Sequence, residues 1–262
     1  MRIVVKLGTS TLTHPTGRIN IRRVEKLCKV LCDIKNEGHE LILVSSGAIG
    51  LGVGKLNMKE RPRDMESIQA AAAVGQCELM YMYDKLFMEH NHVVAQILLT
   101  GRDFDDKECV ANFEAALHRL LDLGVTPVVN ENDCIATAEI SVGDNDTLGA
   151  IVAAHTQADL LIILSDINGL YKEDPRVNPQ AEKLDYVHEV TDQIRSLAGN
   201  KGSSLSVGGM ATKISAGEMV MKEGIDMVIA NGHDPEVLYR ILQGEPVGTR
   251  FLGQKSIESG SR

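Results

Sequence analysis

Short runs of β-branched and aliphatic residues alternate along this chain with longer segments of helical periodicity, which limits the fold more than any other feature. RIVVKL at residues 2–7 predicts a strand, and apolar residues from Val24 to Ile34 then mark one face of a helix that ends near Gly38. Such alternation is typical of right-handed βαβ units. We therefore expect an α/β protein, an αβα sandwich with a mainly parallel sheet. Further strands are predicted at 40–44, 92–99, 126–130, 159–165 and 226–230, and helices at 64–90, 110–123, 146–157, 210–224 and 235–242.

No repeat or linker divides the chain, so we expect one domain over residues 1–252 and a frayed polar tail over 253–262. Within the domain we expect an N-lobe at roughly 1–155 and a C-lobe at roughly 156–252. Weak alternation at 134–141 predicts a small hairpin, and the polar stretch 166–184 reads as loop-rich.

Charge and composition exclude several classes of protein. The formal net charge of −9 argues against a nucleic-acid-binding surface, because phosphate backbones select basic patches. The start of the chain lacks the features of a signal peptide, and no apolar run approaches the roughly 20 residues that span a bilayer. The five cysteines are scattered, and Cys28 and Cys32 are interpreted as core-facing thiols rather than metal ligands. These features predict a cytoplasmic protein.

In open parallel sheets, ligands bind beyond the carboxyl ends of the strands. After the first strand come Lys6 and Gly8, where a lysine charge and a loop of small residues suit an anion. A solvent-facing lysine beside a glycine turn is the alternative. After the second strand, Ser46 and Gly47 offer a hydroxyl and main-chain N–H groups to a carboxylate or phosphate. Ordinary helix capping by serine, together with a flexible glycine-rich loop, is the alternative.

Two acidic and amide clusters follow the strand at 126–130. NEND contains Asp133, and GDND contains Asn145 and Asp146. Asp and Asn are common in turns and caps, which is the alternative for each cluster taken separately. Together, the amides suit an α-carboxylate, Asp133 suits an ammonium group, and Asp146 suits a role in orienting lysines near a phosphate.

Two later segments suggest nucleotide contacts. Ser165 and Asp166 open a loop after the most apolar strand; a calcium-binding loop is rejected there because Val177 stands where its twelfth-position glutamate belongs. GGMATK then opens a helix that carries Lys213, where exposed N–H groups and a lysine suit phosphate. A plain Asx turn and an exposed lysine are the respective alternatives. Lys6 and Lys213 would supply the local cations that an acidic chain needs to bind polyphosphate.

Several segments, in chain order, resemble the glutamate 5-kinases of the amino-acid kinase superfamily. The matching segments are VVKLGTS, VSSGAIG, AAAVGQ, AQILLT, PVVNENDCIATAEISVGDND, SDINGLYKEDPR and GGMATK. K-x-G-x-S and D-x-x-G-x-Y occur across the wider superfamily, whereas NEND followed by GDND is much narrower. The resemblance is to a form without the C-terminal PUA domain that many relatives carry.

The resemblance implies that ATP phosphorylates the side-chain carboxylate of L-glutamate to give L-glutamyl 5-phosphate, the first step of proline biosynthesis. Mg²⁺ would accompany ATP, proline would be a feedback inhibitor, and the chain would form a homo-oligomer, a dimer or tetramer. The N-lobe would bind glutamate through the seat at Ser46 and Gly47 together with Asp133 and Asn145, and the C-lobe would bind ATP. Lys6 would bridge the reacting groups. The implied nucleotide contacts are Lys6, Gly8, Ser165, Asp166, Val207, Gly208, Gly209, Met210, Ala211, Thr212 and Lys213.

The sequence departs from its relatives at Gly101, where they have arginine, and at Phe113-Glu114, where they have Ala-Arg. These departures concern contacts between lobes or subunits. We predict that Lys6 and Lys213 flank the transferred phosphoryl group and that Asp146 holds both; direct metal ligands are not assigned. Alternatives are a kinase for aspartate, acetylglutamate, carbamate or UMP, and a non-catalytic nucleotide or proline sensor. An oxidoreductase is disfavoured because no G-x-G-x-x-G opens the first helix.

Overall fold

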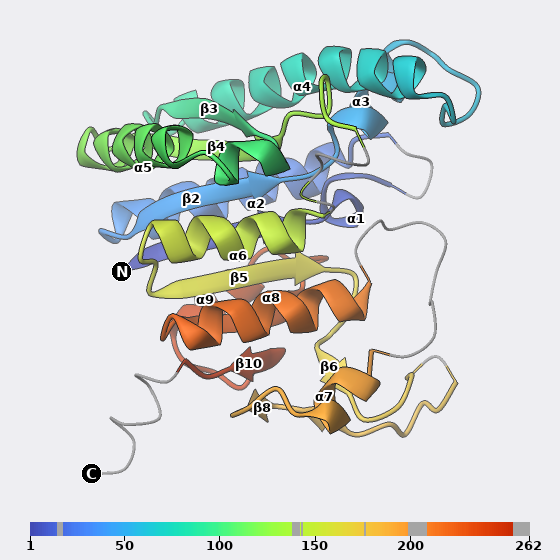
Figure 1. The fold of residues 1–262 in the computed structure, drawn as a ribbon, viewed down its shortest axis with the longest axis vertical. Coiled ribbons are helices and arrows are strands. Elements are labelled where there is room, and N and C mark those ends of the chain that lie inside the picture. The colour runs from blue at the N-terminus through green and yellow to red at the C-terminus, as the bar shows by residue number, and fades with distance from the viewer. Residues whose placement is uncertain (15–17, 138–141, 143, 176, 199–208, 254–262) are drawn as a thin grey trace.

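One twisted sheet runs through the whole molecule (Figure 1). The computed structural model describes residues 1–14, 18–137, 142, 144–175, 177–198 and 209–253. Six neighbouring strands, β3, β4, β2, β1, β5 and β9 in spatial order, are parallel. Strand β10 is antiparallel to β9, and β8 is parallel to β10. In spatial order the strands are β3 (Val94–Leu99), β4 (Thr126–Glu131), β2 (Glu40–Ser45), β1 (Arg2–Leu7), β5 (Leu160–Ser165), β9 (Asp226–Asn231), β10 (Thr249–Phe251) and β8 (Tyr186–Val187).

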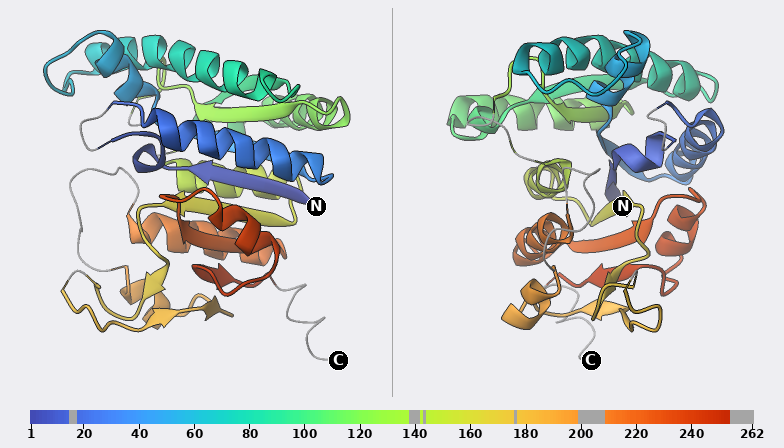
Figure 2. Two further views of the ribbon diagram at one scale, coloured as in Figure 1. Left: turned by 180° about the vertical axis from the view of Figure 1, so that it is seen from behind. Right: turned by 90° about the vertical axis from the view of Figure 1, so that its right-hand side faces the viewer.

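Helices cover both faces of this sheet, so the predicted αβα sandwich is confirmed (Figures 1 and 2). Two aliphatic clusters form the core, one on each side of the strands. Because β1, β2 and β5 are covered on both faces, they are almost continuously apolar. One face carries α2 (Ile21–Asn36), α4 (Met65–Met88) and α9 (Val237–Leu242), and the other carries α5 (Lys107–Asp122), α6 (Asn145–His155) and α8 (Met210–Lys222).

The predicted strands and helices all appear, with ends that shift by a few residues. Side-chain caps explain several helix starts: Asn20 accepts a hydrogen bond from the main-chain N–H of Arg23, and Asp64 accepts one from Ser67. Cys28 and Cys32 are buried in the core, as predicted. Small elements absent from the prediction are α1 (Thr9–Leu12), the 3₁₀ turn Gly101–Phe104, β6 (Leu170–Tyr171), β7 (Lys183–Leu184), β8, α7 (Asp192–Ser196) and β10.

The glycine-rich segment after β2 corrects one interpretation. It suggested a flexible loop as one option, but it forms the helix α3 (Ala48–Lys55), which crosses α4 at very short range. A Cβ on Gly52 would lie 1.8 Å from the carbonyl oxygen of Ala71, and one on Gly75 would lie 1.7 Å from that of Ala48. These glycines serve close helix packing, so they do not indicate a loop. Gly47, at φ +103°, turns the chain into the helix.

The carboxyl ends of the central strands meet at one edge of the sheet. Leu7 at the end of β1 pairs with Ser45 of β2 and Leu164 of β5. Helix α6 begins at this edge and packs across β1. The loops expected to bind ligands therefore converge there. Part of the hairpin predicted at 134–141, and the tail beyond residue 253, lie outside the described residues. None of the described helices is both long enough and apolar enough to span a membrane.

Candidate active site

Lys6 and Lys213 converge on one carboxylate. Lys6 Nζ lies 2.7 Å from Oδ1 of Asp146, and Lys213 Nζ lies 3.0 Å from Oδ2. The Lys6 contact is an ion pair rather than a well-aligned hydrogen bond, because Oδ1 has no well-aligned hydrogen-bond donor among the described residues. Thr212 Oγ1 also donates to Oδ2, at 2.8 Å. We call Lys6, Asp146 and Lys213 the lysine–aspartate centre.

Burial of this centre is nearly complete, with exposed fractions of 7% for Lys6, 4% for Lys213 and 0% for Asp146. The solvent-facing lysine considered for each motif is therefore wrong. Burial lowers the pKa of Lys6, and the Asp146 carboxylate opposes that effect. Burial alone would raise the pKa of Asp146, but the two lysines outweigh it and hold this pKa below its usual value.

The expected nucleotide-binding loops surround this centre as far as the structure describes them. The main-chain N–H of Gly8 donates to the carbonyl of Leu164, which ties the loop after β1 to the end of β5. There Ser165 Oγ donates to Oδ1 of Asp166 at 3.1 Å. Helix α8 begins after Gly209, which has no side chain to cap the first turn, so the N–H groups of that turn suit an anion. Val207 and Gly208 lie outside the described residues.

A second group of side chains is held together by amide hydrogen bonds, and we call Ser46, Gln76, Asn130 and Asn145 the amide pocket. Asn145 Nδ2 lies 2.9 Å from Ser46 Oγ, 3.0 Å from the Ser45 carbonyl and 3.0 Å from Asn130 Oδ1. Asn130 Nδ2 in turn donates to Gln76 Oε1 at 2.9 Å. The pocket thus joins the ends of β2 and β4 to α6 and, through Gln76, to α4.

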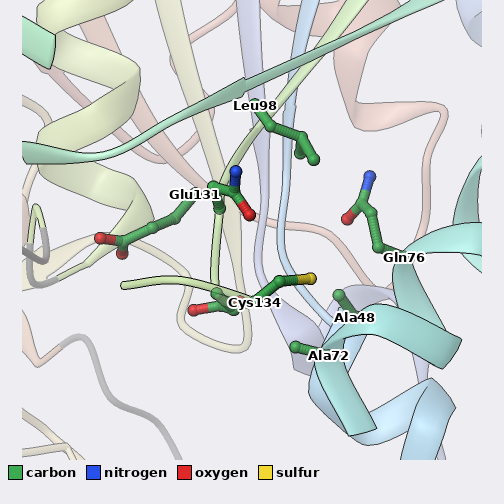
Figure 3. A pocket seen from close by; sticks show the side chains of 8 residues that line it. Ala48, Ala72, Gln76, Leu98, Glu131 and Cys134 are labelled. Carbon is green, nitrogen blue, oxygen red and sulfur yellow. The ribbon is translucent and has the colours of Figure 1, made fainter. Parts of the chain in front are cut away.

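Asp133 lines a small cavity that Ala48 of α3 and Ala72 and Gln76 of α4 help to enclose (Figure 3). Burial, reinforced by the nearby Glu131 carboxylate and partly offset by Arg61, raises the pKa of Asp133 to about 6. A half-buried carboxylate that forms no ion pair within the described part of the chain suits an incoming ammonium group. The cavity is lined by Ala48, Ala72, Gln76, Leu98, Glu131, Asn132, Asp133 and Cys134.

The first turn of α6 connects the two groups. Asp144 caps the helix by accepting from the N–H groups of Asp146 and Thr147, which fixes where the turn begins. Successive helical residues point about 100° apart. Asn145 therefore reaches the amide pocket while Asp146 reaches the lysines. An amino acid bound in the pocket would have its far end beside the lysine–aspartate centre.

Most of the predicted site residues lie together at this edge of the sheet. Lys6 and Lys213 each contact Asp146, and Ser46 contacts Asn145. Sequence reasoning included Asn130 only among the amides that suit an α-carboxylate, and it assigned no role to Gln76, although a glutamine in the apolar helical run AAAVGQ was a usable signal. Amides buried among aliphatic side chains need bonded partners, and such partners are often functional.

Comparison with known proteins agrees with this arrangement. The fold matches that of an isopentenyl phosphate kinase from T. acidophilum, solved as a product complex, with a TM-score of 0.67, 17% identity, and coverage of 96% of this chain and 100% of that one. At that identity the match shows the fold alone. The family model for the amino acid kinase family matches residues 1–231.

The curated relatives are much more similar. The glutamate 5-kinase of Clostridium perfringens is 50% identical over 258 residues, which cover 97% of this chain and 96% of that protein. The glutamate 5-kinase of Clostridium acetobutylicum is 51% identical over 251 residues, covering 96% and 94%. This chain therefore belongs to the amino acid kinase family and, within it, to the glutamate 5-kinases.

Proposed function

We propose that this protein transfers the γ-phosphoryl group of ATP to the side-chain carboxylate of L-glutamate, forming L-glutamyl 5-phosphate for proline biosynthesis. The observation that carries the proposal is the convergence of Lys6 and Lys213 on Asp146, one residue away from the amide contact of Asn145 with Ser46. Relatives at about 50% identity that are glutamate 5-kinases support the choice of acceptor.

In this proposal the amino-acid end of glutamate binds in the N-lobe. Asp133 pairs with the α-ammonium, Ser46 and the N–H groups that follow Gly47 hold carboxylate oxygens, and Asn145 holds Ser46 in place. The side-chain carboxylate then points toward the lysine–aspartate centre. ATP binds against the C-lobe, at the uncapped start of α8 and the loops of Gly8 and Ser165.

The chemistry needs no general base, since the glutamate side chain has a reference pKa near 4.3 and is already ionised. A carboxylate oxygen forms a bond to the γ-phosphorus as the bond from that phosphorus to the β–γ bridging oxygen breaks, and ADP leaves with the electron pair. The barrier is repulsion between two anions. Lys6 and Lys213 offset it by placing positive charge beside the transferred group in a buried site.

The buried residues fit ATP because they combine two cations with helix and loop N–H groups. Mg²⁺ enters the proposal as the ion that ATP carries, neutralising phosphate charge when bound. Both oxygens of Asp146 are in contact with lysines, so this carboxylate serves as their anchor. Proline inhibition and assembly as a dimer or tetramer belong to the same proposal and rest on the family resemblance, and the proposed cytoplasmic location rests on the charge, composition and cysteine pattern of the sequence.

A single assay tests the proposal: ADP release measured with and without glutamate, with hydroxylamine present to trap the acyl phosphate as a hydroxamate. We expect ADP release that depends on glutamate, and a matching yield of hydroxamate. Aspartate, acetylglutamate, carbamate and UMP serve as alternative acceptors in the same assay. Equal or faster turnover of any of them would reassign the acceptor, and no acceptor-dependent ADP release would rule out the kinase.

A further inference from the structure

Gln76 lies one residue beyond the glycine at which α4 crosses α3, and it reaches from α4 toward the end of β4 (Figure 3). We propose that Gln76 is a positioning residue of the glutamate pocket. By accepting a hydrogen bond from Asn130, it holds in place a series of amide hydrogen bonds that ends at the Ser46 hydroxyl and whose direction the main chain sets. The inference rests on the proposed function for the identity of the substrate.

The direction of this chain is set by main-chain groups at both ends. The N–H of Glu131 donates to Asn130 Oδ1 at 2.9 Å, and a main-chain N–H can only donate. The Asn130 amide must therefore present its NH₂ group to Gln76. At the other end, the Ser45 carbonyl can only accept, so Asn145 must present its NH₂ group to Ser45 and Asn130.

This direction determines what the pocket offers to a substrate. The NH₂ group of Asn145 has two hydrogens for three acceptors, so one hydrogen is shared, and the amide nitrogen itself cannot accept a hydrogen bond. The hydroxyl hydrogen of Ser46 is therefore left to donate to a carboxylate oxygen. If Asn130 turned over, its NH₂ group would face the NH₂ group of Asn145 and the chain would break. Gln76 opposes that turn because its oxygen is where the NH₂ group of Asn130 must point.

The setting of Gln76 supports a role for its oxygen rather than for its bulk. Its side chain is 6% exposed, and its Nε2 is buried with no hydrogen-bond partner among the described residues. Such a group is unfavourable, and an apolar side chain of similar size would avoid it. At Gly75 and Gly52 the backbone of α4 packs directly against that of α3, which places Gln76 beside Asn130.

The test compares steady-state kinetics of three variants. Gln76→Met keeps the shape of the side chain and removes the acceptor oxygen, so KM for glutamate should rise roughly tenfold while KM for ATP stays within twofold. The tenfold figure is taken by analogy from groups that hydrogen-bond to metal ligands, whose loss costs at least about that much. Gln76→Glu keeps an acceptor oxygen, and its buried carboxyl will be protonated, so KM should stay within about threefold of wild type. Tyr83→Phe is the matched control, since it removes a buried hydrogen bond to Ser45 from the same helix.

A double-mutant cycle separates positioning from a general loss of packing. In an Asn145→Ala background the chain is already broken, so adding Gln76→Met should leave KM for glutamate unchanged. A merely structural role would add the same factor in both backgrounds. If Gln76→Met does not fold, Gln76→Asn replaces it, because a shorter amide withdraws the oxygen from Asn130 and should raise KM similarly.

Wild-type enzyme is assayed first, so that the two proposals can fail separately. No glutamate-dependent ADP release from wild type would remove the proposed function. Normal wild-type turnover would leave that function intact, and the inference about Gln76 would then be overturned by any of three results: an unchanged KM in Gln76→Met, an equal rise in Tyr83→Phe, or additivity with Asn145→Ala.

Discussion

The lysine–aspartate centre is held together by charge, whereas the amide pocket is held together by hydrogen bonds between neutral groups whose direction the main chain sets. Asp146 holds two lysines that would otherwise repel each other, and the burial of all three makes the centre depend on each member. In the amide pocket, Asn130 and Asn145 are each tied to a main-chain group. Losing one member of the centre leaves a buried charge unpaired. Losing one amide changes the direction of the hydrogen bonds in the pocket and the fit of the proposed substrate.

This difference matches the two tasks of the site. A phosphoryl group in transfer needs concentrated positive charge, because the obstacle is electrostatic. An amino acid needs discrimination, because its ends carry opposite charges in a fixed arrangement. We therefore expect mutations in the centre to lower kcat and to destabilise the fold, and mutations in the pocket to raise KM for glutamate.

The largest effect is expected for Asp146→Asn. The substitution removes the charge that holds two buried lysines, and breaking a buried ion pair costs about 3 to 5 kcal/mol of unfolding free energy. Without the carboxylate, the pKa of Lys6 should fall further, because burial already lowers it. Chemical denaturation and kcat should both show a large loss. A variant of wild-type stability would contradict the interdependence of the centre.

Next in size are Lys6→Ala and Lys213→Ala. Each should lower kcat at least about a hundredfold, by analogy with the loss of a single oxyanion donor. Lys26→Ala is the matched control and should leave kcat unchanged, because the ion pairs of Lys26 among the described residues, with Asp234 and Glu236, are exposed. Near-normal turnover in both lysine variants would remove the proposed mechanism.

Asp133→Ala should affect the other half of the site. Loss of the partner for the α-ammonium should raise KM for glutamate at least about tenfold, as expected for one charge-assisted contact, and should leave the affinity for ATP nearly intact. Cys134→Ala is the control, since Cys134 lines the same cavity without carrying the charge. A defect confined to ATP would reassign this loop to the nucleotide.

Sequence reasoning succeeded where local pattern and strand topology decide the outcome. The strand ends fixed which loops meet, so Lys6, Ser46 and Asp146 could be assigned to one edge before the structure was known. The lysines looked equally compatible with exposure, because no local pattern reveals that α6 and α8 bury them. The motifs predict that Asp146 holds both lysines, whereas the strand order that brings these three residues together is displayed only by the folded sheet.

The glycines of α3 show a second limit. Gly52 faces Ala71, and Gly75 faces Ala48 across the helix crossing, so each glycine is explained by a residue distant in sequence. Read locally, the same glycines suggest a loop. Local sequence does not reveal the role inferred for Gln76 either, because its partner Asn130 lies in β4, beyond β3 and α5 along the chain.

The smallest expected effect is a pH dependence confined to the amide-pocket side of the site. The pKa of Asp133 is raised to about 6, chiefly by burial, so its folded-state pKa lies above the unfolded value. Ionisation is then less favourable in the folded protein, and this group should lower stability as pH rises from about 4 to about 6. Relative to Asp133→Asn, wild type should therefore lose stability over that interval.

Substrate binding should change in the opposite direction over the same pH range. Only the ionised form of Asp133 pairs with an ammonium, so at pH 5 about a tenth of the sites would be competent and KM for glutamate should rise roughly tenfold. The glutamate side chain stays largely ionised there, and kcat should change little because the pKa of Asp146 is held below its usual value. Asp133→Asn should show a high KM that no longer varies with pH. A KM that rises equally in this variant would place the titrating group elsewhere.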